Sequence, residues 1–126
     1  MKNYIVEATK YTPYIEFDIA KGNLKMEGDT YPENSYDTFK PLLDKIDEYF
    51  LDSIKSLNVE INIEFLNTSS SKMMREIISK LDEYFEADHN ISLKWYYPDG
   101  DIDLQESWEM LLEDVLFPYE IVAVED

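Results

Sequence analysis

The fold is decided by the stretch Val59-Glu60-Ile61-Asn62-Ile63-Glu64-Phe65, in which apolar and polar residues alternate. Such alternation is typical of a strand with one face in the core and the other in water. We expect the strand to stop at Asn67, where a run of hydroxyl residues, Thr68–Ser71, begins. Beyond it, apolar residues at helical spacing predict a helix: Met74, Ile77, Ile78, Leu81 and Phe85.

Other strands are predicted on both sides of this unit by the same alternation. They cover residues 15–19, 24–27, 91–95 and 119–124. The segment Ala20-Lys21-Gly22-Asn23 has the composition of a hairpin turn, so the first two strands are expected to be antiparallel.

Two further helices are predicted by apolar residues that recur every three or four positions. One contains Tyr36, Phe39, Leu43, Ile46 and Phe50, and the other contains Leu104, Trp108, Leu111, Leu112 and Val115. Ser35 is a plausible N-cap for the first of them. Because Pro41 lies in that stretch, its regular part is expected to begin only near Phe39.

The predicted order is ββαβαβαβ in a single α/β domain over residues 1–126, with Met1–Thr12 as a loose N-terminal arm. Right-handed strand-helix-strand crossovers imply a mixed sheet with all helices on one face. Since every second strand residue is polar, the other sheet face is expected to be largely open to water.

The chain is strongly acidic, with 28 Asp and Glu against 11 Lys and Arg and a formal net charge of -17. Such a charge opposes binding to nucleic acid and to anionic membranes. No apolar run approaches the roughly 20 residues of a spanning helix, and the start lacks the apolar core of a signal peptide. The absence of cysteine fits a reducing compartment, so a cytoplasmic protein is expected.

The segment Asn67-Thr68-Ser69-Ser70 joins a predicted strand to a predicted helix. Free backbone N–H groups and the positive end of the helix dipole favour an anion there, so a phosphate is one interpretation. The other is that one hydroxyl caps the helix. Four hydroxyl residues in a row exceed what a cap needs, and both interpretations stay open on pattern alone.

A second candidate segment, Gly28–Ser35, joins the hairpin to the first helix. It mixes turn-forming residues with an aromatic side chain, Tyr31. A turn followed by a helix cap explains this composition, whereas an exposed Tyr31 would make the segment an interaction loop.

No catalytic or metal site is predicted. Asp99, Asp101 and Asp103 have the spacing that opens a calcium loop, but Leu104 and Met110 stand where glycine and a bidentate acid are required. A turn and a helix cap at Asp101 or Asp103 explain the triplet. The single histidine, His89, is expected to be a solvated loop residue, and no nucleophile-base set can be assembled. We therefore expect no enzyme, no metal and no cofactor.

Several segments together resemble the SiaC-type regulatory phosphoproteins. They are Gly28-Asp29-Thr30-Tyr31-Pro32-Glu33-Asn34-Ser35-Tyr36, Phe65-Leu66-Asn67-Thr68-Ser69-Ser70, Lys72-Met73-Met74 and Phe117-Pro118-Tyr119-Glu120-Ile121-Val122. The similarity runs from about Thr12 to the C-terminus. It implies a fold similar to the STAS domain of anti-sigma-factor antagonists, with a phosphoacceptor at the start of the second helix.

The resemblance also implies a function. A protein kinase of the SiaB or anti-sigma-factor type would phosphorylate Thr68, with Ser69 as the next candidate, and a metal-dependent Ser/Thr phosphatase would reverse this. The unmodified form would bind and activate an effector, a diguanylate cyclase in cyclic di-GMP signalling and biofilm formation. The alternative is an anti-sigma-factor antagonist that acts on transcription. The partner-binding residues implied are Asp29, Tyr31, Pro32, Glu33, Asn34, Ser35, Asn67, Thr68, Ser69 and Ser70.

Overall fold

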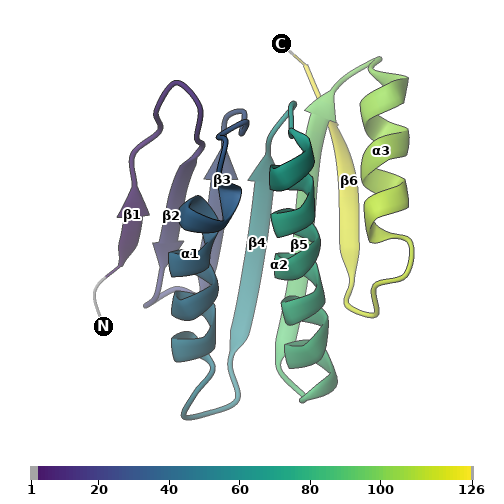
Figure 1. The fold of residues 1–126 in the computed structure, drawn as a ribbon. Coiled ribbons are helices and arrows are strands. Elements are labelled where there is room, and N and C mark those ends of the chain that lie inside the picture. Colours follow the sequence, from purple (N-terminus) through teal and green to yellow (C-terminus); the bar gives the residue numbers. More distant parts are fainter. Residues whose placement is uncertain (1–2, 126) are drawn as a thin grey trace.

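Residues 3–125 are described by a computed structural model, in which one six-stranded sheet carries three helices on one face (Figure 1). The strands are β1 (Tyr4–Val6), β2 (Tyr14–Asp18), β3 (Asn23–Glu27), β4 (Ser56–Asn62), β5 (Asn90–Pro98) and β6 (Tyr119–Val124). The helices are α1 (Ser35–Tyr49), α2 (Thr68–Glu86) and α3 (Ile102–Leu112).

The strands lie in the sheet in the order in which they occur in the chain. β1, β2 and β3 are antiparallel neighbours, and β3, β4, β5 and β6 are parallel. Each parallel pair is joined through a helix, and these helices all lie on the same side of the sheet (Figure 1). The predicted mixed α/β fold with helices on one face is therefore confirmed.

The observed order contains one strand more than predicted. β1 pairs with β2 through Tyr4 opposite Phe17 and Val6 opposite Ile15. The interpretation of Met1–Thr12 as a loose arm is therefore corrected for Tyr4–Val6, while Met1 and Lys2 lie outside the described residues. Three residues are too few for an alternating pattern to be recognised in the sequence. The strand forms because it pairs with β2.

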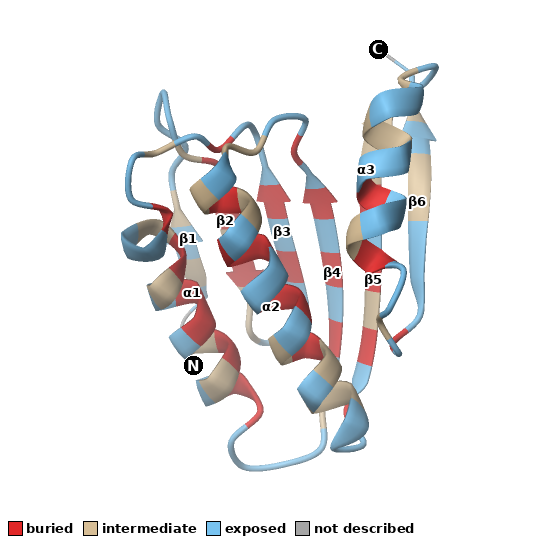
Figure 2. Ribbon diagram, turned by 45° about the vertical axis from the view of Figure 1, so that its right-hand side comes forward, coloured by how far each residue is buried: buried red, intermediate tan, exposed pale blue. Residues whose placement is uncertain are grey.

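The core lies between the sheet and the helices, as the buried faces in Figure 2 show. Trp95 of β5 and Trp108 of α3 stack with ring centroids 4.3 Å apart, and this contact packs α3 against the sheet.

His89 was predicted to be solvated but is buried between α1 and the sheet end. Its Nδ1 accepts a hydrogen bond from Lys55 N at 3.1 Å. Its ring lies 4.4 Å from that of Phe50. A polar sequence context did not reveal this packing.

The open sheet face carries a row of alternating charge. Cross-strand register places five charged residues opposite one another on neighbouring strands, in the order Glu16, Lys25, Glu60, Lys94 and Glu120. Opposite charges on facing positions of a sheet stabilise the pairing by about 0.2–1 kcal/mol each. A charged row of this kind keeps the uncovered face in water, as the alternation in the sequence predicts.

Helix α1 begins earlier than predicted. Asn34, not Ser35, is the N-cap, because its side chain accepts from Asp37 N at 3.3 Å. The helix then continues through Pro41, although its start was expected near Phe39. Pro41 itself is exposed, and the buried residues on either side of it pack in the core, which offsets the cost of a proline inside the helix.

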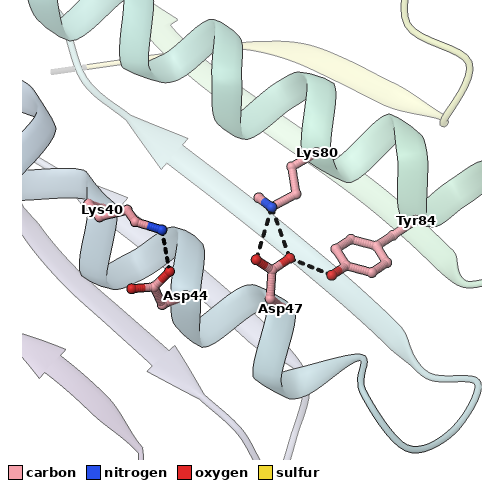
Figure 3. Close-up of polar contacts among 5 residues, drawn as sticks. All are labelled: Lys40, Asp44, Asp47, Lys80 and Tyr84. Carbon is pink, nitrogen blue, oxygen red and sulfur yellow. Dashed lines mark hydrogen bonds and ion pairs between the residues drawn. The ribbon is translucent and has the colours of Figure 1, made fainter.

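A polar brace joins α1 to α2 (Figure 3). Asp47 of α1 accepts hydrogen bonds from Lys80 Nζ at 2.9 and 3.0 Å and from the Tyr84 hydroxyl, both on α2. Partial burial alone raises the pKa of Asp47, but the bonds from Tyr84 and Lys80 outweigh it and lower the pKa below its ordinary value. Burial and the Asp47 carboxylate raise the pKa of Tyr84. The brace fixes the spacing of the two helices that carry the candidate site.

Candidate functional site

The two candidate loops lie side by side at the carboxyl ends of β3 and β4. Thr30 N donates to Phe65 O at 3.0 Å, and Asn67 N donates to Thr30 O at 3.2 Å. Thr30 and Leu66 form an isolated parallel bridge beyond the ends of the two strands. The sheet pairing thus continues into the loops, and the segments that sequence analysis selected separately form one surface.

Asn67 connects the two loops and caps helix α2. Its Oδ1 accepts from Ser70 N at 2.9 Å, and its Nδ2 donates to Pro32 O at 2.8 Å. The interpretation that one of the hydroxyls caps the helix is therefore wrong, because the amide takes that position. The following hydroxyls are left for other contacts.

Three consecutive hydroxyls, on Thr68, Ser69 and Ser70, differ sharply in environment. Thr68 is exposed at the first position of α2, and its hydroxyl makes no hydrogen bond to any residue between 3 and 125. Ser69 is half-buried and Ser70 is fully buried. Thr68 is thus the most accessible hydroxyl of the three.

The less exposed hydroxyls form a connected set with Thr30 and Ser35, which are both buried. Ser70 Oγ lies 2.9 Å from Thr30 Oγ1 and 2.7 Å from Ser35 Oγ. Ser35 Oγ lies 2.7 Å from Ser69 Oγ, which in turn contacts Asn67 Oδ1 at 3.4 Å and Pro32 O at 3.5 Å. We call Thr30, Ser70, Ser35 and Ser69 the hydroxyl chain.

The start of α2 is electrostatically suited to a phosphate on Thr68. The first turn holds no acidic residue, and the helix runs for 19 residues. The N-terminal end of a helix attracts negative charge through its free N–H groups and its dipole. Lys72, one turn along the same face, adds a positive charge. A phosphate on Thr68 therefore meets no repulsion from the helix to which it is attached.

An exposed group of aromatic rings borders the two loops. The ring centroid of Tyr31 lies 5.4 Å from that of Tyr11 and 5.7 Å from that of Phe65, both edge to face. The three side chains are 37%, 50% and 52% exposed for Tyr31, Tyr11 and Phe65. We call these three residues the aromatic patch. Exposed aromatic side chains are enriched at the centres of protein interfaces.

Sequence analysis selected Tyr31 but missed Tyr11 and Phe65. Phe65 was assigned to the buried side of a strand, yet β4 ends at Asn62, whose partner Glu27 is the last residue of β3. Without a partner strand the alternation no longer determines which side chains are buried. The signal that could have identified Phe65 is the turn composition at Gly28, which limits the length of β3.

The remaining predicted residues divide into supporting and exposed ones. Asp29 Oδ1 accepts from Glu64 N at 3.3 Å and from Phe65 N at 3.1 Å, and Asn34 caps α1. These side chains shape the loops. Glu33 projects to solvent, as Tyr31 and Thr68 do, so these three are free to meet a partner.

Elsewhere the acidic triplet serves the fold. Asp101 is the N-cap of α3 and accepts from Leu104 N at 3.1 Å, as its cap interpretation required. Between residues 3 and 125, no three His, Asp or Glu side chains converge on a point that a metal ion could occupy. None of the helices described is both long and apolar enough to cross a membrane.

Comparison with known proteins shows the family of this chain. Residues 6–124 match the family model described as SiaC family regulatory phosphoprotein. An uncharacterized protein of Pseudomonas aeruginosa (strain UCBPP-PA14) is 35% identical over 123 residues, which cover 98% of each chain.

Two solved structures are similar over nearly the whole chain. SiaC of Pseudomonas aeruginosa is 35% identical, with a TM-score of 0.90 over 98% of this chain and 100% of that one. SiaC from the same organism in complex with the diguanylate cyclase SiaD, of which it is the activator, gives a TM-score of 0.92 at 35% identity, over 96% of this chain and 99% of that one. The family consists of regulatory proteins, so the expectation that this is not an enzyme is confirmed. The chain belongs to the SiaC family of regulatory phosphoproteins.

Proposed function

We propose that this protein is a phosphorylation-controlled activator of a diguanylate cyclase in the cytoplasm. A kinase of the SiaB or anti-sigma-factor type phosphorylates Thr68, and a metal-dependent Ser/Thr phosphatase removes the phosphate. The observation that carries the proposal is the position of Thr68 on the first residue of α2, beside the Asp29–Ser35 loop. Its hydroxyl is exposed and bonds to no residue between 3 and 125. Ser69 is a poorer acceptor because it is half-buried and bonded.

The unmodified protein binds its cyclase through the surface that the two loops share. Tyr31, Glu33 and Thr68 provide exposed contacts there, and the aromatic patch supplies apolar area next to them. Rigid aromatic side chains lose little conformational freedom on binding, so they contribute much of the affinity of an interface. The relative that was solved with its cyclase supports a cyclase rather than an anti-sigma factor as the partner class.

Phosphorylation changes recognition and leaves folding intact. A phosphate adds up to about two negative charges. The helix end accommodates them in the free protein, whereas an interface built around a neutral hydroxyl would bury them without a partner. Such a charge costs on the order of 2 to 5 kcal/mol, or roughly 30- to 4000-fold in affinity. That change is large enough to switch the cyclase off.

The test uses SiaD of Pseudomonas aeruginosa as the probe, with SiaC of that organism as the positive control. Affinity is measured by calorimetry and cyclic di-GMP formation by chromatography, for unmodified protein, protein phosphorylated at Thr68, and Thr68→Ala. Unmodified protein and Thr68→Ala should activate the cyclase, and the phosphorylated form should not. Ser79→Ala, an exposed hydroxyl on the same helix, is the matched control and should behave as wild type.

Two outcomes would contradict the proposal. One is phosphorylated protein that binds and activates as strongly as the unmodified form. The other is unmodified protein that fails to activate a cyclase that the positive control activates. Thermal melts of every form are recorded, because loss of binding through unfolding would also exclude a recognition switch.

A further inference from the structure

One direction of donation gives every proton of the hydroxyl chain an acceptor. Each of its four hydroxyls carries one proton, so each can donate once. Thr30 can donate to Ser70, Ser70 to Ser35, and Ser35 to Ser69, over distances of 2.9, 2.7 and 2.7 Å. Ser69 then donates to Asn67 Oδ1 at 3.4 Å or to Pro32 O at 3.5 Å. If the direction is reversed, Ser69 donates to Ser35 and no longer to Asn67 Oδ1 or Pro32 O. The proton of Thr30 then has no acceptor within the hydroxyl chain.

The hydroxyl chain joins the two loops through three hydrogen bonds. Thr30 and Ser35 belong to the segment before and at the start of α1, whereas Ser69 and Ser70 belong to the first turn of α2. Thr30, Ser35 and Ser70 are each 0% exposed. Hydrogen bonds in such a dry site are stronger than in water and costly to break. The loops are therefore held together by side chains as well as by the backbone bonds at Thr30 and Asn67.

We propose that the hydroxyl chain is a lock that holds the two loops in contact and restricts phosphorylation to Thr68, so that Ser69 is a second acceptor only when the lock is open. The choice of Thr68 as the acceptor rests on the proposed function, whereas the contact between the two loops is a property of this chain alone. The lock gives a positioning role to Thr30 and Ser35, which lie far from Thr68 in the sequence.

A phosphate on Ser69 is incompatible with the closed loops. The Ser69 oxygen lies 2.7 Å from Ser35 Oγ and faces two acceptors, Asn67 Oδ1 and Pro32 O. Phosphorylation removes the proton that Ser69 donates to them and adds oxygens that only accept at neutral pH. Repulsion and lack of space would then separate the Pro32 segment from the start of α2. A phosphate on Thr68 meets neither obstacle, because that side chain points to solvent.

The test needs no kinase and no cyclase. Phosphoserine is inserted by codon reassignment at position 69 in one protein and at position 68 in another, and Thr68→Ser serves as the unmodified reference. Amide hydrogen exchange is measured at Thr30 and Asn67, whose N–H groups bond across the loops. With the phosphate at position 69, exchange there should be accelerated at least about tenfold, equivalent to the loss of one hydrogen bond. With the phosphate at position 68, both amides should exchange as in the reference.

A second variant tests the lock without phosphate. Ser35→Ala removes the central hydroxyl and should accelerate exchange at the same two amides by about three- to tenfold, and Ser79→Ala should not. Equal exchange in the two phosphorylated proteins, or no effect of Ser35→Ala, would overturn the lock. Neither result would touch the proposed cyclase switch, which depends on the affinity of the Thr68-phosphorylated form; conversely, failure of that switch would leave these exchange rates unchanged.

Discussion

Replacing Asp47 by asparagine should destabilise the protein by more than its exposed position suggests. The Asp47 side chain is 46% exposed, so its ion pair with Lys80 contributes only about 0.5 kcal/mol. The bond from the Tyr84 hydroxyl to the carboxylate is charge-assisted, and weakening it costs about 1 kcal/mol more. We therefore expect Asp47→Asn to lower the free energy of unfolding by about 1–2 kcal/mol at pH 7.

Urea denaturation followed by tryptophan fluorescence measures this change. Trp95 and Trp108, the two tryptophans of the chain, stack on each other in the core, so their emission reports on loss of tertiary packing. Asp44→Asn is the matched control, because Asp44 pairs with Lys40 within α1 and both side chains are largely exposed. Its effect should stay below about 0.5 kcal/mol. If the two substitutions lowered the free energy of unfolding equally, the stabilising role of the Asp47 brace would be refuted.

The difference between wild type and Asp47→Asn should also depend on pH. Asp47 has a folded-state pKa below its ordinary value of 3.8, so the unfolded chain binds its proton more readily than the folded protein does. The stabilisation is therefore present above the unfolded pKa and is lost as the pH falls through the folded one. Unfolding measured between pH 7 and pH 3 should show the difference between the two proteins shrinking below about pH 4. If the difference in unfolding free energy between the two proteins grew as the pH fell, the lowered pKa of Asp47 would be contradicted.

Three further predictions concern the site, and a fourth concerns the acidic triplet before α3. Thr68→Asp should weaken cyclase binding only in part, by calorimetry, since a carboxylate carries less charge than phosphate; a complete loss would indicate a steric effect instead. Tyr31→Ala should reduce cyclase affinity at least about tenfold without lowering the melting temperature, whereas Tyr119→Ala, 38% exposed on β6 against 37% for Tyr31, should not change it. Asn67→Ala should cost about 1–2 kcal/mol of stability in urea, because it removes a helix cap and the bond to Pro32. Calorimetric titration with calcium should give no binding tighter than about 10 μM, since the Asp99–Asp103 segment lacks the later ligands of a calcium loop.

The parts of the fold that sequence analysis predicted correctly are those that a local pattern determines. The strand at Tyr119–Val124 was predicted with the bounds that the structure has. A cap at Asp101 or Asp103 was expected after the turn, and Asp101 is the cap. The sheet was expected to be mixed because a hairpin pairs strands antiparallel and strand-helix-strand crossovers pair them parallel. The shared hand of the crossovers predicted helices on one face. Each of these inferences uses residues that are near one another in the chain.

Two of the errors occurred where distant residues decide the structure. Tyr4–Val6 is a strand because β2 offers it an edge, and His89 is buried because Phe50 and Tyr84 surround it. For the same reason the site could be predicted only in outline. The two loops were identified from their composition, but the pairing of Ser35 with Ser69 and Ser70 joins positions more than 30 residues apart. Nothing in the neighbourhood of either position indicates such a contact.

The sheet order described above also bears on how the protein is made. Because β1 to β6 lie in the sheet in chain order, every strand pairs with the one synthesised just before it. Each pairing therefore closes only the connection between two consecutive strands. The nascent chain can therefore add one strand and one helix at a time to a growing sheet as it leaves the ribosome. Every residue of the Thr68 surface, from Tyr11 to Ser70, is synthesised before the last two strands.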